Sequence, residues 1–239
     1  MIKDELISIS EAAGLLEVSI DTLRRWDKNG KFRSIKSKGG HRRYSKIQIE
    51  LYLNDLFGLA QEWILRNFEI PSQFYCSNSA TFQTRLIKMQ DELSIIPELS
   101  YIFSLIVAVT GEIGNNSFDH NIGNWPNMPG IFFGYDLHKK RIALADRGLG
   151  VLTTLKRVKT ELNTDEEALQ VAFTEILSGR APESRGNDLK FVRQIITDNP
   201  IGLKFESGDA ELEIIKNGGQ LAIQRSAFNF RGCLALITF

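Results

Sequence analysis

The sequence contains few of the residues that cross-link a chain or span a membrane, and each shortage excludes a class of protein. Its two cysteines, Cys76 and Cys233, are too few for a disulfide framework and stand in no metal-ligand spacing. We therefore expect reduced thiols in a reducing compartment. The longest apolar run, residues 101–109, is too short to cross a bilayer, and the first residues lack the apolar core of a signal peptide. A soluble cytoplasmic protein without a membrane partner is the expectation.

Net charge is also absent, because 29 basic residues balance 29 acidic ones. The balance is uneven along the chain: between residues 24 and 46, ten basic side chains stand against one acid, Asp27. Such a segment predicts a surface that binds anions. Hydrophobic residues make up 43% of the chain, enough for real cores, and we divide it into two domains, residues 1–68 and 69–239.

The first thirty residues have the pattern of a helix-turn-helix. Ser10 is predicted to cap a short helix whose apolar positions point inward. Ser19 is predicted to cap a second helix through about Asn29, with apolar residues at helical spacing and basic residues between them.

A hairpin and a further helix are predicted next. Residues 31–44 form two short extended pieces around a glycine pair at residues 39 and 40, the pattern of a hairpin wing. Ser45 is a suitable cap for a helix from Lys46 to about Asn67.

Four separated motifs in this segment resemble the DNA-binding domain of MerR-type and excisionase-type winged helix proteins. They are Ile9-Ser-Glu-Ala-Ala13, Thr22-Leu-Arg-Arg-Trp26, Asn29-Gly-Lys31 and Gly39-Gly-His-Arg-Arg-Tyr44. The resemblance implies binding to double-stranded DNA, with the second helix in the major groove and the wing on the backbone or in the minor groove. MerR-type regulators usually dimerise through a long helix after this domain. The helix expected after Ser45 is short for that role, so a homodimer stays open. The residues implied in DNA contact are Ser19, Thr22, Arg24, Arg25, Lys28, Lys38, His41, Arg42, Arg43 and Tyr44.

The rest of the chain interleaves helical and extended segments, which predicts a mixed α and β class. Helices are expected near residues 81–89, from the apolar run at residues 101–109 through His120, over residues 164–177 and over residues 187–196. Strands are expected at residues 131–136, 141–145, 201–206, 210–216, 220–224 and 233–239.

Two features of this half carry chemistry. Glu112, Asn116 and His120 recur every four residues, so they share one face of a helix. A solvated polar stripe is the alternative interpretation of that pattern. Downstream, Asp146-Arg-Gly-Leu-Gly150 follows an apolar strand, and its glycines let the backbone turn sharply and a ligand approach.

Together the two features resemble the N-box and first glycine box of the GHKL superfamily, the ATP-binding fold of gyrase-type topoisomerases, Hsp90, histidine kinases and MutL. The resemblance implies a two-layer α/β sandwich with a mixed sheet that binds ATP and Mg²⁺. It implies that Asn116 holds Mg²⁺, that Asp146 reads the adenine amino group, and that Glu112 acts as general base. Further nucleotide contacts are implied for Gly148, Gly150, Arg180, Arg185, Gly186, Leu189 and Lys190, several of them in a lid at residues 178–186.

Two positions depart from that superfamily. Asp188 stands where the second glycine box has a glycine, so its carboxylate would repel a triphosphate. Cys233 stands where many relatives have a threonine. We expect a DNA-binding transcriptional or DNA-transaction regulator whose ATP- and Mg²⁺-binding domain modulates DNA binding, with slow ATP hydrolysis left open. The alternatives are a serine/threonine protein kinase similar to the anti-sigma factor kinases, which needs an unidentified protein partner, and a degenerate domain used only for assembly.

Overall fold

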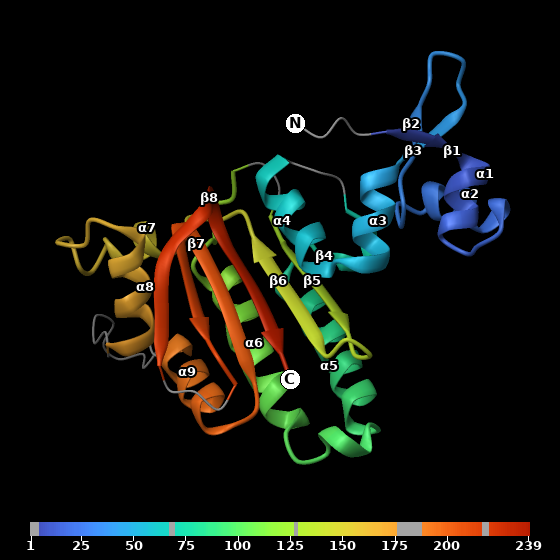
Figure 1. Cartoon of the computed structure of the whole chain (residues 1–239). Helices are drawn as coiled ribbons and strands as arrows, with labels where there is room; N and C mark the ends of the chain where they lie inside the picture. The colour runs from blue at the N-terminus through green and yellow to red at the C-terminus, as the bar shows by residue number, and fades with distance from the viewer. Residues whose placement is uncertain (1–4, 67–69, 127–128, 176–187, 217–219) are drawn as a thin grey trace. The chain divides into compact units, whose positions relative to one another are not determined.

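The computed structural model describes residues 5–66, 70–126, 129–175, 188–216 and 220–239. The chain divides into two compact units, Met1–Tyr75 and Cys76–Phe239 (Figure 1). The boundary predicted between residues 68 and 69 falls in a stretch outside the described residues. Among the helices of the described ranges, none has the length and hydropathy of a membrane span.

The first unit begins with β1 (Leu6–Ser8), α1 (Ile9–Leu15) and α2 (Ile20–Lys28). Ser19 caps α2, since its hydroxyl accepts the Thr22 N–H at 3.0 Å, as predicted. The cap of α1 is Ser8, so the prediction of Ser10 is wrong. Ser8 has Glu11 three residues later, and the two exchange side-chain to backbone hydrogen bonds at 2.8 and 3.2 Å. Ser10 already lies inside the first turn because this reciprocal capping box fixes the helix start.

The predicted wing is present, with a strand that the sequence did not reveal. β2 (Ile35–Lys36) and β3 (Arg42–Ser45) pair antiparallel, and β1 pairs with the other edge of β3. The sheet therefore has the order β1-β3-β2. The core of this unit takes residues from β1, α1, α2 and β3, and it includes the fully buried Leu23, Phe32 and Tyr44.

The helix predicted from residue 46 to residue 67 is instead two helices, α3 (Lys46–Asn54) and α4 (Leu56–Arg66). Ser45 caps α3 as predicted, accepting the Gln48 N–H at 3.0 Å. Asp55 leaves helical geometry, and its carboxylate accepts the Gly58 N–H at 2.9 Å. The helix breaks there because an aspartate side chain replaces the missing backbone partner at the start of a helix. The short helix η1 (Ser72–Phe74) follows.

The second unit is organised on a five-stranded sheet of order β4-β5-β6-β8-β7. The strands are β4 (Tyr75–Cys76), β5 (Ile131–Asp136), β6 (Arg141–Asp146), β7 (Gly202–Ile214) and β8 (Leu221–Thr238). The pairings among β5, β6, β8 and β7 are all antiparallel, so a mixed sheet is not found there. The four strands predicted after residue 200 are two long strands in the structure: the first two predicted strands belong to β7 and the last two to β8. Register shifts between Ser207 and Ala210 let β7 continue through its glycine instead of ending there.

Helices cover one face of this sheet (Figure 1). They are α5 (Ser79–Ser94), α6 (Phe103–Asp119), α8 (Asp165–Thr174) and α9 (Asp188–Asp198). Their apolar sides share one core with the strands, where the Phe82 and Phe133 rings lie 5.2 Å apart. The short helices η2 (Pro97–Leu99) and α7 (Val151–Leu155) complete the unit, and α7 was not predicted. The α+β class is confirmed.

Candidate functional site

A basic surface lies on α2, opposite the residue that anchors this helix. Leu23 is fully buried, whereas Arg24, Arg25 and Lys28 are exposed. Arg24 is 2.9 Å from Asp21, an exposed pair of the kind that contributes little to stability. Ser19 and Thr22 lie at the start of the same helix, where their hydroxyls are 2.9 Å apart. The face of α2 that is turned to solvent is therefore cationic and free of large apolar side chains.

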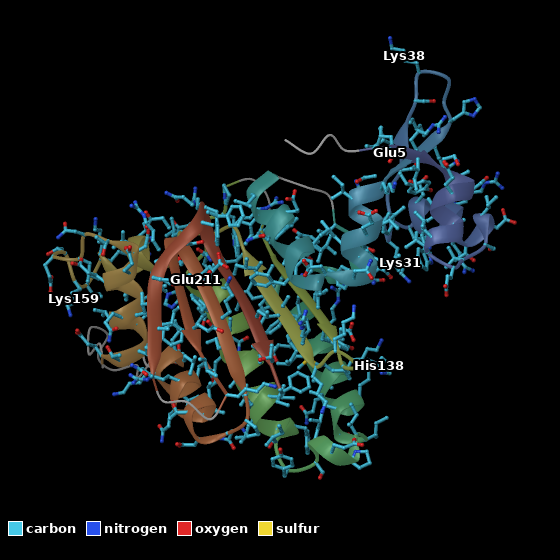
Figure 2. All side chains as sticks on the ribbon, viewed as in Figure 1. Glu5, Lys31, Lys38, His138, Lys159 and Glu211 are labelled. Carbon is cyan, nitrogen blue, oxygen red and sulfur yellow. The ribbon has the colours of Figure 1, made fainter. Side chains whose placement is uncertain are left out.

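The wing presents a second group of exposed polar and basic residues. Lys38, His41 and Arg43 are exposed, and Lys38 projects from the tip of the hairpin (Figure 2). All three come from the β2–β3 hairpin and its loop. These are side chains that can reach a polyanion without any rearrangement of the core.

Arg42, also in the wing, has a different position from the one expected. Its Nε lies 2.5 Å from Asp27 Oδ2, and the other carboxylate oxygen accepts the Ser34 N–H at 2.8 Å. Burial raises the pKa of Asp27, but the hydrogen bonds from Arg42 and Ser34 outweigh it and leave the pKa lowered. Arg42 thus ties the wing to the end of α2 and is already paired.

Tyr44 is a core residue and not part of the surface. It is fully buried, with its ring 6.2 Å from that of Phe32. The expectation that its side chain contacts DNA is therefore corrected, because no part of it reaches the surface of this unit. Sequence reasoning also missed Asp27 as the partner of Arg42; its isolation among ten basic residues was the available signal.

The second unit brings the predicted aspartate against the predicted helix. Asp146, the last residue of β6, is 1% exposed. Its carboxylate accepts hydrogen bonds from Ser117 Oγ at 2.9 Å, Asn121 Nδ2 at 3.2 Å and Gly148 N at 2.8 Å. Burial raises the pKa of Asp146 to about 6 even though these hydrogen bonds oppose the rise. Ser117 follows Asn116 directly on α6, so the two sequence features lie next to each other.

The glycine turn after Asp146 is held by β7 and β8. Ser207 Oγ accepts the Val151 N–H at 2.9 Å and donates to the Gly232 carbonyl at 3.0 Å. Gly150 has φ 78°, and a Cβ on it would lie 3.1 Å from Ser207 Oγ. Cys233 Sγ is 3.7 Å from the same hydroxyl. A serine on β7, which the sequence did not single out, therefore connects the turn to the strand that carries Cys233.

The acid of α6, Glu112, lies near Asp188 at the start of α9. Glu112 is half-buried, and its pKa is raised by burial and by the nearby Asp188 carboxylate. Asn116 lies one turn further along and is also half-buried; its side chain makes no hydrogen bond to any described residue. His120 is exposed at the end of α6. Among the described residues the Asn116 carboxamide thus has no hydrogen-bond partner, and it lies one turn from Glu112, which is close to the Asp188 carboxylate.

Part of the predicted nucleotide site lies outside the structure's described ranges. Arg180, Arg185 and Gly186 belong to that part. Leu189 and Lys190 are half-buried in the first turn of α9, and Leu189 packs against the core. In the described portion of the chain, no three His, Cys, Asp or Glu side chains are grouped so that they could hold a metal ion. A cation there would depend on Asn116 and on the ligand.

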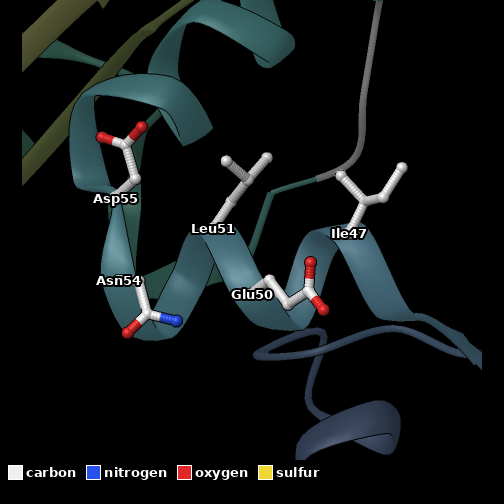
Figure 3. A pocket seen from close by; sticks show the side chains of 5 residues that line it. All are labelled: Ile47, Glu50, Leu51, Asn54 and Asp55. Atoms are coloured by element: carbon white, nitrogen blue, oxygen red, sulfur yellow. The ribbon is translucent and has the colours of Figure 1, made fainter. Parts of the chain in front are cut away.

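A depression of about 500 Å³ lies on α3, and its lining includes none of the candidate site residues described above. Ile47 and Leu51 project from the same side of the helix there (Figure 3). The charged groups of its lining, Glu50 and Asp55, are both acidic. It therefore matches neither a phosphate nor a DNA site.

Comparison with known proteins identifies the first part of the chain. Residues 8–44 match the family model described as "MerR family regulatory protein". The match covers α1, α2 and the wing, and it does not reach the second unit. A search of curated proteins found no match to this chain. Residues 8–44 are therefore similar to the helix-turn-helix segment of MerR family regulatory proteins.

Proposed function

We propose that the protein is a regulator that binds double-stranded DNA through α2 and the wing. The observation that carries this function is the solvent face of α2, where Arg24, Arg25 and Lys28 are exposed above the buried Leu23. An α-helix fits the major groove, and arginine and lysine bind guanine edges or phosphates there. The family match over the same residues supports the assignment.

In this proposal the wing makes a second contact with DNA, and an ion pair fixes the position of the wing relative to α2. The pair between Asp27 and Arg42 joins the end of α2 to β3, so the wing residues keep one orientation relative to the helix. Lys38, His41 and Arg43 would then meet the backbone beside the groove that α2 enters. In this scheme Arg42 positions the wing rather than binding a phosphate.

The assignment is tested with DNA that the wild-type protein selects from a random pool. Fluorescence anisotropy then compares wild type, Arg25→Ala and Lys88→Ala, the last a charge removal on α5 with 72% of its side chain exposed. We expect Arg25→Ala to weaken binding about fivefold or more, corresponding to about 1–3 kcal/mol. Lys88→Ala should bind like wild type. Equal affinity of all three proteins would refute the role of α2.

We propose in addition that the second unit binds ATP with Mg²⁺ between α6 and the Asp146 turn. Three observations support the fit: the Asn116 carboxamide, which has no hydrogen-bond partner among the described residues, the buried Asp146 acceptor beside α6, and the glycine turn. Asn116 would hold Mg²⁺, Lys190 would add positive charge, and Asp146 would accept from the adenine amino group. Glu112 would be the base if the nucleotide is hydrolysed, because its raised pKa suits proton transfer.

The carboxylates of Glu112 and Asp188 would repel a bound triphosphate, and this repulsion can be tested by removing one of the charges. Calorimetric titration with ATP and Mg²⁺ should show Asn116→Ala binding more weakly than wild type and Asp188→Asn more tightly, since one negative charge is removed. Asp198→Asn, the same change at the other end of α9, is the control. Absence of heat with every variant at millimolar ATP would remove the nucleotide function and leave the DNA function untouched.

A modulation of DNA binding by ATP follows only if the two ligands interact energetically. DNA affinity measured with and without saturating ATP decides this, because a ligand that binds both states equally shifts neither. We expect different affinities; identical ones would leave two independent binding functions.

A further inference from the structure

Asn121 was not among the predicted site residues, yet its side chain lies against Asp146 and the glycine turn. Asn121 lies just past the end of α6 and is 4% exposed. Its Nδ2 donates to Asp146 Oδ1 at 3.2 Å and to the Ser117 carbonyl at 2.8 Å, while its Oδ1 accepts the Leu149 N–H at 2.8 Å. A Cβ built on Gly148 would lie 2.0 Å from the Asn121 amide. The space in front of this glycine is therefore filled by the carboxamide.

The hydrogen bonds of Asn121 define what else would fit the same place. The Asp146 carboxylate is an acceptor and the Leu149 N–H is a donor, and both are met by one planar group that carries an amino donor beside an acceptor. The edge of adenine has this arrangement, with its amino group next to a ring nitrogen. Guanine presents a carbonyl beside an N–H on that edge, which is the reverse order.

An arginine of β8 bridges the two turns that lie next to Asn121. Arg231 Nε donates to the Gly148 carbonyl at 2.7 Å, and its Nη2 donates to the Asn124 carbonyl at 2.7 Å. One side chain thus joins the glycine turn to the turn that follows α6. The neighbouring Ile122 is 75% exposed and Gly123 has φ 75°, so the residues directly after Asn121 lie at the surface, before Trp125 packs against the core.

We propose that Asn121 is an intramolecular occupant of an adenine-recognition site, and that a ligand binds only when Asn121 leaves Asp146 and Leu149. This displacement of Asn121, called the Asn121 gate below, rests on the nucleotide site proposed above. Because the competent state is then a fraction of the population, the measured affinity of the wild type is reduced by that fraction. Arg231 is a positioning residue, since it favours the occupied state without touching the ligand position.

The test is calorimetric titration of ATP with Mg²⁺ into the wild type, Asn121→Ala and Arg231→Ala. Asn163→Ala is the matched control, because Asn163 is exposed in another part of the unit and, among the described residues, its side chain donates to the Glu161 carbonyl alone. We expect Asn121→Ala to bind about tenfold more tightly than wild type, the equivalent of about 1.4 kcal/mol. Arg231→Ala should change affinity in the same direction, GTP should bind more weakly than ATP, and Asn163→Ala should match wild type.

A second measurement uses the wild type, so that the result does not depend on the folding of a variant. The side-chain amide resonances of Asn121 should shift on ATP addition as its hydrogen bond to Asp146 is lost. If ATP binds while these resonances stay unchanged, or if Asn121→Ala binds no more tightly than wild type, the gate is overturned and the nucleotide site stands. If neither the wild type nor Asn121→Ala binds ATP, the nucleotide site and the gate fall together.

Discussion

Replacing Asp146 with asparagine should abolish one pH dependence of stability in the second unit. The carboxyl is buried, and its pKa is raised from the ordinary 3.8 to about 6. Below about pH 4 it is protonated in both the folded and the unfolded chain. Between about pH 4 and 6 the folded chain keeps a proton that the unfolded chain has lost, and this stabilises the folded state. The stabilisation disappears as the pH rises through 6.

The magnitude follows from the two pKa values. A change from 3.8 to about 6 corresponds to about 3 kcal/mol of unfolding free energy. Because Asp146 is 1% exposed, solvent does not screen this effect appreciably. Asparagine does not titrate, and its carboxamide oxygen can still accept from Gly148. The unfolding free energy of wild type minus that of Asp146→Asn should therefore fall by about 3 kcal/mol between pH 4 and 7.5.

The assay is urea unfolding of both proteins across this pH range, followed by the fluorescence of Trp125. Both proteins carry Trp26→Phe and Trp63→Phe, so the remaining tryptophan reports on the second unit. Taking the difference at each pH cancels the titration of the other carboxylates, which the two proteins share. A difference that stays constant with pH would refute the burial of a titrating carboxyl at this position.

Three further predictions concern the first unit. Asp27→Asn should lower its unfolding free energy by about 1–2 kcal/mol in urea unfolding, a value reduced because Arg42 is 36% exposed; no loss would contradict the tether between α2 and the wing. Ser8→Ala should cost about 1 kcal/mol and Ser10→Ala almost nothing in the same assay, and the reverse order would move the cap back to Ser10. Tyr44→Phe should leave DNA affinity unchanged in anisotropy, whereas a tenfold loss would place the tyrosine hydroxyl on DNA.

Helix starts in the first unit were predictable from the sequence where they depend on residues within one turn of each other. Ser19 and Ser45 cap helices because an oxygen at that position satisfies a free N–H whatever the rest of the fold does. The choice between Ser8 and Ser10 also had a local answer, since Glu11 stands three residues after Ser8. The break at Asp55 was missed because the apolar residues continue at helical spacing on both sides of it, although an aspartate is a common helix cap.

Long-range contacts were predictable only where a motif marked both partners. The sequence motifs placed Asp146 near α6, but they did not include Ser117, which donates to Asp146 across 29 positions. Asn121 lies outside the four-residue stripe of α6, so nothing in the pattern singled it out. The contact of Arg231 with Gly148 spans 83 positions and depends on the register of β8. Such contacts follow from tertiary packing and leave no periodic signal.

The most direct test of the central claim, that the cationic faces of α2 and the wing bind DNA, is the salt dependence of binding. Each phosphate contact contributes about 0.9 to the slope of log affinity against log salt concentration. The variant Arg25→Ala/Arg43→Ala removes one exposed cation from each face. If both residues contact phosphates, its slope should be shallower than that of wild type by about two. A wild-type slope in the double variant would contradict the assignment of this surface to DNA.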